Sequence, residues 1–218
     1  MAVYNRTGFK GTYYGSSFNS SDPLELQHMQ VNARYIYNYW SEMGITTNAI
    51  CGMLGNFHVE SGLNPGRWEN DNVNDMDHGY GLVQFTPASE YINLVRRYDS
   101  NEDPSTMDNN LYYIIEYESQ HTFKYYPTDE YPESLTEFVL STKTPGYLAK
   151  AFLWNYERPK VYNYEERVKW ANYWYEFLTG SAPPIDPDDP PTPTPTPNGK
   201  KRKGYNFVLF NRRRRIYG

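Results

Sequence analysis

The sequence predicts an α+β fold that is mainly α, with about six to seven helices and a small β-hairpin or ribbon at about residues 67–85. Apolar side chains recur every three or four positions through most of residues 21–180, as they do along the buried face of a helix. After the second expected helix, a polar run is followed by short apolar segments that are typical of strands. The chain has 218 residues, which is enough for one well-filled core.

Each helix is expected where a capping residue or an early proline precedes an apolar stripe. Ser21-Asp22-Pro23 opens the first helix, which Gly44 ends, and Thr47 caps the second. Gly180 terminates the last helix, because a glycine readily adopts the left-handed conformation that follows a helix. The expected helices begin at about residues 24, 47, 87, 104, 132, 145 and 164.

The second helix carries two glycines in its interior, Gly52 and Gly55. Each glycine costs a helix about 1 kcal/mol relative to alanine. We expect close approach of another backbone to compensate, which makes this the central helix of the fold. The single cysteine, Cys51, lies in the same helix and is expected to be a buried structural thiol.

An acidic residue ends the apolar stripe of this central helix. Ile50, Met53, Leu54 and Phe57 follow helical spacing, and one further step of three reaches Glu60. A carboxyl group on a buried face is costly when ionised, so burial favours the protonated form. A carboxylic acid that keeps its proton near neutral pH is what a general acid needs. The alternative is a helix-end glutamate that turns to solvent.

Composition divides the chain into four segments. Residues 1–20 read as an arm rich in Gly, Ser, Asn and Tyr, and residues 21–180 as one domain. Residues 181–199 form a linker rich in Pro and Thr, which is expected to be extended. Residues 200–218 form a basic tail around a short apolar patch.

Charge is distributed unevenly between the domain and the tail. Residues 1–180 contain 13 basic and 23 acidic side chains, a net charge of −10. An acidic body disfavours nucleic acid as a partner. The tail holds eight basic residues and no acidic one. It could act as an anchor for an anionic partner or remain solvated.

Several classes of protein are disfavoured by the sequence. The start of the chain has no apolar core of signal-peptide length, and no segment is long enough to span a bilayer. One cysteine allows no intrachain disulfide, and the four histidines are scattered. No metal and no cofactor are expected.

Three longer segments resemble one known family. They are AICGMLGNFHVESGLNPGRWEN, GYGLVQFTPASEYIN and STKTPGYLAKAFLWNYERP. Together they are similar to the phage tail lysozyme family, the lysozyme-like domain of the tail-tip (knob) protein of short-tailed phages of Gram-positive bacteria. The resemblance covers most of residues 30–178. It implies the fold of the lysozyme and lytic transglycosylase superfamily, and cleavage of the β-1,4 bond between N-acetylmuramic acid and N-acetylglucosamine.

The resemblance also implies roles for individual residues. Glu60 matches the catalytic acid of the family. Tyr80, Gln84 and Phe85 fall in the ribbon that lines the substrate cleft of the superfamily, and Tyr156 opens a Tyr-Glu-Arg-Pro string expected near that cleft. In that string Glu157 and Arg158 could equally form a structural ion pair.

One position departs from the pattern of hen-type lysozymes. Those enzymes carry an aspartate nucleophile immediately before the Tyr-Gly of the ribbon, and here that position is Gly79. Asp75 and Asp77 are near in sequence and are candidates for a second carboxylate. Three routes remain: inversion with one of these aspartates holding water, hydrolysis with Glu60 nearly alone, or transglycosylation. We favour hydrolysis.

Partners and location follow from the resemblance too. It implies bacterial peptidoglycan as substrate, a place in the virion at the phage tail tip, and other tail proteins as partners. Residues 1–20 and 200–218 are the candidate segments for those contacts. The alternatives are a structural or wall-binding tail component with a catalytically silent site, and a helical chitinase of the same superfamily. Nucleic acid and membrane are not expected as partners.

Overall fold

The computed structural model describes residues 13, 24–121, 124–159 and 163–184. All of them belong to one compact unit, Met1–Pro187. The mainly helical, lysozyme-like fold is confirmed. Within the described residues the α-helices are α1 (Leu26–Glu42), α2 (Thr47–Ser61), α3 (Ala88–Arg96), α4 (Met107–His121), α5 (Leu135–Val139), α6 (Pro145–Phe152) and α7 (Tyr164–Thr179).

Some sequence-based predictions concern residues outside this description. They are the N-terminal arm apart from Tyr13, the expected helix start at Ser21–Pro23, most of the linker and the basic tail. In the part that is described, no helix combines the length and apolar character needed to cross a membrane.

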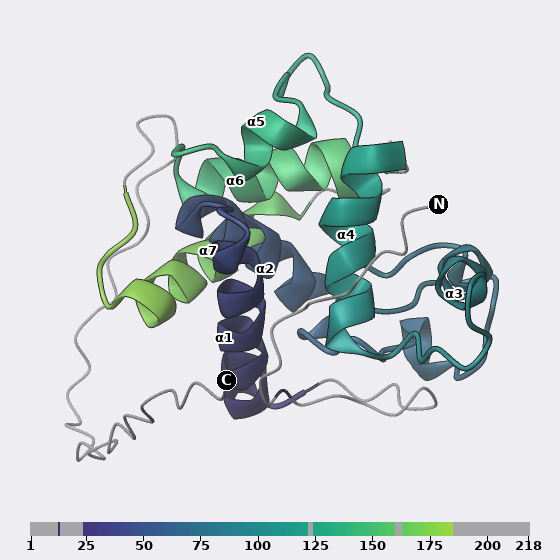
Figure 1. Cartoon of the computed structure of the whole chain (residues 1–218). Coiled ribbons are helices and arrows are strands. Elements are labelled where there is room, and N and C mark those ends of the chain that lie inside the picture. Colours follow the sequence, from purple (N-terminus) through teal and green to yellow (C-terminus); the bar gives the residue numbers. More distant parts are fainter. Residues whose placement is uncertain (1–12, 14–23, 122–123, 160–162, 185–218) are drawn as a thin grey trace, which may run out of the picture. The chain divides into compact units, whose positions relative to one another are not determined.

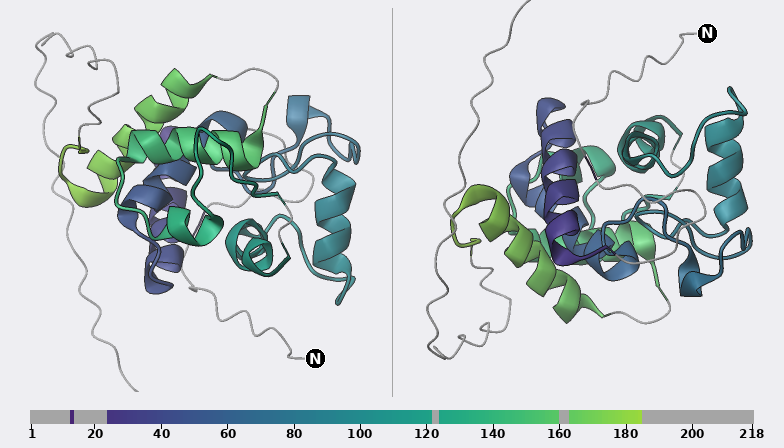
Figure 2. Two further views of the ribbon diagram at one scale, coloured as in Figure 1. Left: turned by 90° about the horizontal axis from the view of Figure 1, so that it is seen from above. Right: turned by 90° about the horizontal axis from the view of Figure 1, so that it is seen from below.

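Helix α2 is the centre of the fold, as its two glycines predict. It packs against α1, α5, α6 and α7. Figure 1 and both views of Figure 2 place α4 between this group and α3. A hydrogen bond connects α1 to α4: the hydroxyl of Tyr39 in α1 donates to Glu116 Oε1 in α4 at 2.8 Å.

The two glycines of α2 face two different helices at very short range. A Cβ added at Gly52 would lie 2.8 Å from the Cβ of Leu148 and 2.9 Å from the amide nitrogen of Ala149, both in α6. A Cβ added at Gly55 would lie 2.4 Å from the carbonyl oxygen of Arg167 in α7. The expected close approach of another backbone is therefore confirmed at both positions.

The helix ends follow the predicted signals closely. Thr46, rather than Thr47, caps α2, and its hydroxyl accepts a hydrogen bond from the amide of Ala49. Gly62 adopts the left-handed conformation that ends α2, and Gly180 does the same for α7.

The segment between α2 and α3 contains less β-structure than the sequence predicts. Among the described residues, the expected ribbon consists of two isolated antiparallel bridges, Trp68 with Tyr80 and Tyr80 with Phe85. Positive φ angles at Asn70, Asn74, Gly81 and Gln84 turn the chain too often for a longer ladder to form. Aromatic packing holds the segment instead: ring centroids are 4.5 Å apart for Trp68 and Tyr80 and 4.3 Å for Phe85 and Tyr91.

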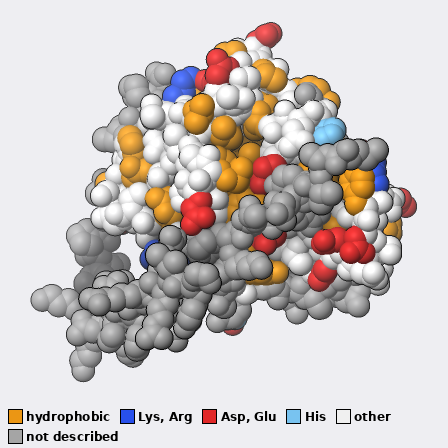
Figure 3. Space-filling model, viewed as in Figure 1, with side chains coloured by type: hydrophobic (Ala, Val, Ile, Leu, Met, Phe, Trp, Pro, Cys, Tyr) orange, Lys and Arg blue, Asp and Glu red, His pale blue; other side chains and the backbone are white. Residues whose placement is uncertain are grey.

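The surface of the described domain agrees with its acidic composition. On the face shown in Figure 3, acidic side chains are spread over the described surface, and Lys and Arg appear toward its margins. Cys51 is buried, and burial raises the pKa of its thiol. The prediction of a structural thiol fits both observations.

A first prediction concerns the crossing of α2 and α7. At an exposed helical position, replacing glycine by alanine stabilises a helix by about 1 kcal/mol. Gly55→Ala should instead destabilise the protein by about 1–3 kcal/mol, because its methyl group would overlap the backbone of Arg167. Urea denaturation followed by circular dichroism measures the change, with Glu176→Ala on the exposed side of α7 as the control. An unchanged or increased free energy of unfolding would contradict the proposed packing.

A second prediction concerns His58, which stacks on Trp170 of α7 with ring centroids 3.4 Å apart. Burial, with a smaller contribution from the charge of Lys169, lowers the pKa of His58 from 6.5 to about 4. The unfolded chain then binds more protons than the folded one between these two pH values, so stability falls as pH falls from about 6.5 toward 4. His58→Phe keeps the stacking and should flatten this part of the pH–stability curve.

Thermal unfolding at several pH values measures the effect, with the exposed His121→Gln as the control. If His58→Phe and the parent protein lose stability in parallel between pH 6.5 and 4, the buried neutral histidine is not responsible.

Candidate active site

Glu60 lies in the last turn of α2, where the apolar stripe meets the surface. Its side chain is 20% exposed, and its Oε1 accepts a charge-assisted hydrogen bond from Nη2 of Arg167. Arg167 comes from the first turn of α7 and is 4% exposed. Neither the buried nor the solvent-facing alternative describes Glu60 fully, because it is a half-buried carboxyl group in an ion pair.

Arg167 is itself held in place by Asn56, one turn before Glu60 on α2. Its Nη1 donates to Asn56 Oδ1 at 3.0 Å. The Asn56 amide donates in turn to the carbonyl oxygens of Gly52 and Ala149, each at 3.0 Å. This chain of hydrogen bonds joins α2, α6 and α7 behind the carboxyl group of Glu60 and fixes its position.

Glu60 lines a cleft of about 780 Å³. The lining combines carboxyl groups, basic side chains and aromatic rings, which is a suitable set for a polar ligand with apolar faces. The cleft residues come from four parts of the chain: α2, the segment that joins α2 to α3, the start of the segment after α4, and the residues that follow α6. They are Glu60, Arg67, Glu69, Asn70, His78, Val83, Gln84, Phe85, Thr86, Lys124, Tyr156, Glu157, Arg158 and Pro159.

The structure brings some of the predicted site residues to this cleft. Gln84, Phe85 and Tyr156 line it. The side-chain amide of Gln84 donates to the carbonyl oxygen of Gly81 at 2.9 Å, so it also stabilises its own turn. Tyr156 stacks on Phe152 with centroids 4.7 Å apart and is only 3% exposed, so it forms the floor of the cleft rather than a projecting platform.

Tyr80 was predicted to contact substrate, and the structure places it in the core. It is 0% exposed and packs between Trp68 and Tyr91. Its bridge partners Trp68 and Phe85 are buried too, at 0% and 2% exposed, so the ring of Tyr80 packs with theirs against the core.

Asp75 and Asp77 do not line the cleft. Asp75 accepts hydrogen bonds from the amide of Asp77 at 3.2 Å and from Asn72 Nδ2 at 2.6 Å. Asp75 also pairs with His78, and this contact lowers the pKa of Asp75 and raises that of His78. Asp77 is exposed. The two aspartates therefore form a surface turn next to the cleft.

A side chain at position 79 would have to displace the side chains of Gln84 and Glu69. A Cβ there would lie 2.9 Å from Gln84 Oε1 and 3.0 Å from Glu69 Oε2. Glu69 Oε2 accepts a hydrogen bond from the amide of Gly79 at 2.8 Å, and the amide of Glu69 donates to the carbonyl oxygen of Gly79 at 2.9 Å. The carboxylate of Glu69 thus occupies the space beside residue 79 and lines the cleft.

After α6 the chain forms a π-helix, η2 (Leu153–Glu157), which Arg158 ends in a left-handed conformation with φ of 46°. Turns of this kind are frequent at functional sites. The guanidinium of Arg158 donates to the carbonyl oxygen of Lys124 at 2.9 Å and lies 4.8 Å from the ring centroid of Tyr126. Arg158 therefore stabilises the loop that follows α4. Its neighbour Glu157 lines the cleft together with Glu60.

Glu157 occupies an unusual electrostatic environment. Its Oε1 is buried and accepts no hydrogen bond. Burial, and then the negative charge of Glu60, raises the pKa of Glu157 well above its ordinary value. These surroundings favour the protonated form of Glu157, which lines the same cleft as the ion-paired Glu60.

Sequence reasoning missed Arg167 and Glu69. Arg167 is separated from Glu60 by 107 residues, and no local motif reveals that pairing. Glu69 could have been noticed, because it lies between the aromatic Trp68 and the polar run that precedes Gly79.

This fold and this cleft define a lysozyme-like domain, in which a helix-end glutamate lies beside a short irregular β segment. Residues 31–178 match the phage tail lysozyme family. The match covers more than half of the chain, and the chain belongs to that family. A similar protein is Morphogenesis protein 1 of Bacillus phage B103, which is 42% identical over 159 residues, covering 73% of this chain and 42% of that protein. The chain spans less than half the length of this relative.

Proposed function

We propose that this chain is a peptidoglycan-degrading glycoside hydrolase, a lysozyme that cleaves the β-1,4 bond between N-acetylmuramic acid and N-acetylglucosamine. Membership of the phage tail lysozyme family supports the proposal. The observation that carries it is the position of Glu60: a half-buried carboxyl group in the lining of a cleft, held in place by Arg167.

In the proposed reaction, Glu60 gives a proton to the glycosidic oxygen while the bond from that oxygen to the sugar C1 breaks. The departing sugar then leaves as an alcohol, which avoids the cost of an alkoxide leaving group. The other sugar develops positive charge at C1 and the ring oxygen. Water adds to C1 and loses a proton to the site, which restores the starting state.

A second carboxylate facing the sugar would stabilise this positive charge or hold the attacking water. Glu69 is the carboxylate that we assign to this role, because it lines the cleft and fills the space beside Gly79. The amide of Gly79 fixes one of its oxygens. This assignment replaces Asp75 and Asp77, whose contacts keep them in the neighbouring surface turn.

The basic side chains in the cleft lining favour peptidoglycan over chitin as the substrate. Arg67, Lys124 and Arg158 line the cleft within a domain that is acidic overall. Chitin is neutral, whereas the lactyl group of muramic acid and the peptide attached to it carry carboxylates that such cations attract. Phe85 and Tyr156 supply apolar surface for the faces of the sugar rings.

The relative from Bacillus phage B103 is named as a morphogenesis protein. By analogy we place this chain in a phage virion, at the tail tip, where cleavage of the wall would assist entry. Other tail proteins would be its partners, with residues 1–20 and 200–218 as the segments assigned to those contacts. The basic tail would then meet an acidic protein surface or an anionic polymer of the wall.

A third prediction tests the proposed activity. Glu60→Gln keeps the shape of the side chain and an oxygen for Arg167, but cannot carry the transferable proton. Clearing of purified Gram-positive cell walls should fall by at least about 100-fold, with the circular dichroism spectrum and wall binding retained. The control is Glu90→Gln, an exposed residue of α3. A Glu60→Gln protein that still clears walls at the parent rate would refute the assignment.

Mass spectrometry of the products separates the alternative functions. Reducing muramic acid ends identify a hydrolase, anhydro ends identify a lytic transglycosylase that uses the same Glu60, and no product identifies a silent structural component. Digestion of chitin oligosaccharides in place of peptidoglycan would identify a chitinase.

A fourth prediction compares Glu69 with Asp77. Glu69→Gln retains an oxygen for the Gly79 amide and removes only the charge, so kcat should fall by at least about 100-fold with stability retained. Asp77→Asn should change kcat by less than about tenfold, which is about 1.4 kcal/mol of barrier. A large loss for Asp77→Asn together with full activity for Glu69→Gln would reverse this assignment.

A further inference from the structure

Of the Lys and Arg side chains described in the cleft lining, two hold the wall of the cleft together. Lys124 Nζ donates to the carbonyl oxygen of Thr86 at 3.1 Å, and Arg158 donates to the carbonyl oxygen of Lys124 at 2.9 Å. The guanidinium of Arg158 also lies over the ring of Tyr126. Both cations therefore have structural partners before any ligand arrives.

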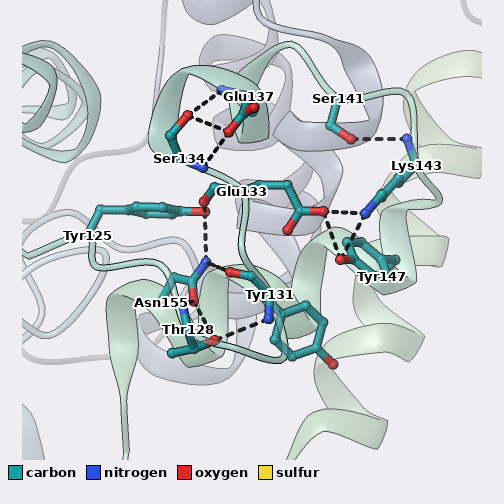
Figure 4. Close-up of polar contacts among 10 residues, drawn as sticks. All are labelled: Tyr125, Thr128, Tyr131, Glu133, Ser134, Glu137, Ser141, Lys143, Tyr147 and Asn155. Carbon is teal, nitrogen blue, oxygen red and sulfur yellow. Dashed lines mark hydrogen bonds and ion pairs between the residues drawn. The ribbon is translucent and has the colours of Figure 1, made fainter.

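The wall that carries Lys124 is fastened to the residues after α6 by Asn155 of η2. Asn155 is 0% exposed, and its side chain makes four hydrogen bonds to the segment before α5, as Figure 4 shows. Its Oδ1 accepts from the amide and the hydroxyl of Thr128, at 3.1 and 2.9 Å. Its Nδ2 donates to the Tyr125 hydroxyl at 3.0 Å and to the Tyr131 carbonyl oxygen at 2.8 Å. This side of the cleft is therefore a preformed wall.

Arg67 differs from the other two cations of the lining. Among the residues that the structure describes, no hydrogen bond, ion pair or ring contact involves its guanidinium. Its neighbours Gly66 and Trp68 are buried, and Arg67 itself is half-buried. A charged side chain that is partly removed from water usually has a partner. A guanidinium without one, in the lining of a cleft, is placed to contact a ligand.

The local pairing of the chain turns Arg67 toward the cleft. Trp68 is bridged to Tyr80, and both rings are in the core. The backbone of Trp68 is extended, with φ of −96° and ψ of 143°. Because side chains alternate along an extended segment, Arg67 and Glu69 lie on the opposite side from the Trp68 ring, where both line the cleft. The amide of Gly81 fixes this backbone by donating to the carbonyl oxygen of Arg67 at 2.9 Å.

We propose that Arg67 binds a carboxylate carried by the muramic acid residue of the substrate, and that this contact determines the preference for peptidoglycan over neutral chitin. The inference rests on the proposed function. Residues two apart in an extended segment are separated by about 7 Å, which is about the width of one sugar ring. With Glu69 facing C1 of the muramic acid, Arg67 can reach the substituent on C3 of the same ring. A guanidinium suits this ligand, because its parallel N–H groups bind both oxygens of a carboxylate.

The carboxylate can come from two places on the muramic acid residue. The lactyl group on C3 has a free carboxylate when the stem peptide is absent, and is joined to the peptide by an amide bond when it is present. The peptide carries carboxylates of its own, further from the ring. Both sources offer the same chemistry to a guanidinium, whereas a chitin strand offers neither.

The experiment measures binding to the full 218-residue chain carrying Glu60→Gln, so that the probes are not cleaved. The probes are soluble glycan strands with intact stem peptides, strands whose peptides an amidase has removed, and chitin oligosaccharides of matched length. Adding Arg67→Gln should weaken binding of charged strands at least about tenfold, and binding of chitin less than about twofold. Weaker binding of the stripped strands identifies the lactyl carboxylate, and weaker binding of only the strands with peptides identifies a peptide carboxylate.

Two further variants separate a specific contact from general charge. Arg67→Lys keeps the charge without the parallel donors and should restore part of the affinity for charged strands. Arg97→Gln removes a positive charge from an exposed position at the end of α3 and is the matched control, with binding expected to equal that of the Glu60→Gln parent. Arg67→Gln, unlike this control, should also reduce the salt dependence of binding to charged strands. Its circular dichroism spectrum and thermal midpoint should match those of the parent.

Equal weakening for charged strands and chitin, or no weakening for any probe, overturns the assignment of Arg67. In the chain that retains Glu60, Arg67→Gln should raise KM for peptidoglycan with kcat little changed. The two proposals fail separately. Charge-dependent binding through Arg67 without release of products from cell walls would refute only the hydrolase function. Hydrolysis of walls with binding that is indifferent to Arg67→Gln would refute only the carboxylate site.

Discussion

The close crossing of α2 and α7 determines both the core and the candidate active site. Gly55 allows the backbone of Arg167 to approach α2, and no larger residue fits there. The side chain of Arg167 can then reach Asn56 and Glu60 on the same face of α2. A wider crossing would leave a buried guanidinium far from its carboxylate, which is a costly arrangement. The same crossing therefore determines both the packing of the core and the position of the Glu60 carboxyl group.

Local signals in the sequence were sufficient to predict the frame of the fold. The stripe that leads to Glu60, the glycines that require a close neighbour and the glycine stop at Gly180 all depend on residues within one or two helical turns. Such patterns report on the conformation of a short segment, and α2 has the position they indicate. The length of the ribbon was not predictable in the same way, because turns at Asn70 and Asn74 require left-handed backbone that the residue type permits but does not demand.

The composition of the site depended on contacts that no short segment contains. Arg167 meets Glu60 across 107 positions, and Glu69 meets Gly79 across 10. For Tyr80, the motif predicted a contact with substrate that the structure does not show. Its ring is buried, because it fills the space between Trp68 and Tyr91. A motif indicates which segment of the chain lies near a site. The direction in which each side chain points depends on packing against residues that are distant in the sequence.

The electrostatics of the cleft follow from the different surroundings of its three carboxyl groups. Glu60 is paired with a cation and Glu69 accepts a hydrogen bond from a backbone amide, whereas Oε1 of Glu157 is buried without a hydrogen bond. Hydrogen bonds to a carboxylate favour its charged form, and burial without them favours the neutral form. The sequence offers three chemically identical side chains. The fold makes them different, and a proton-transfer reaction requires that difference.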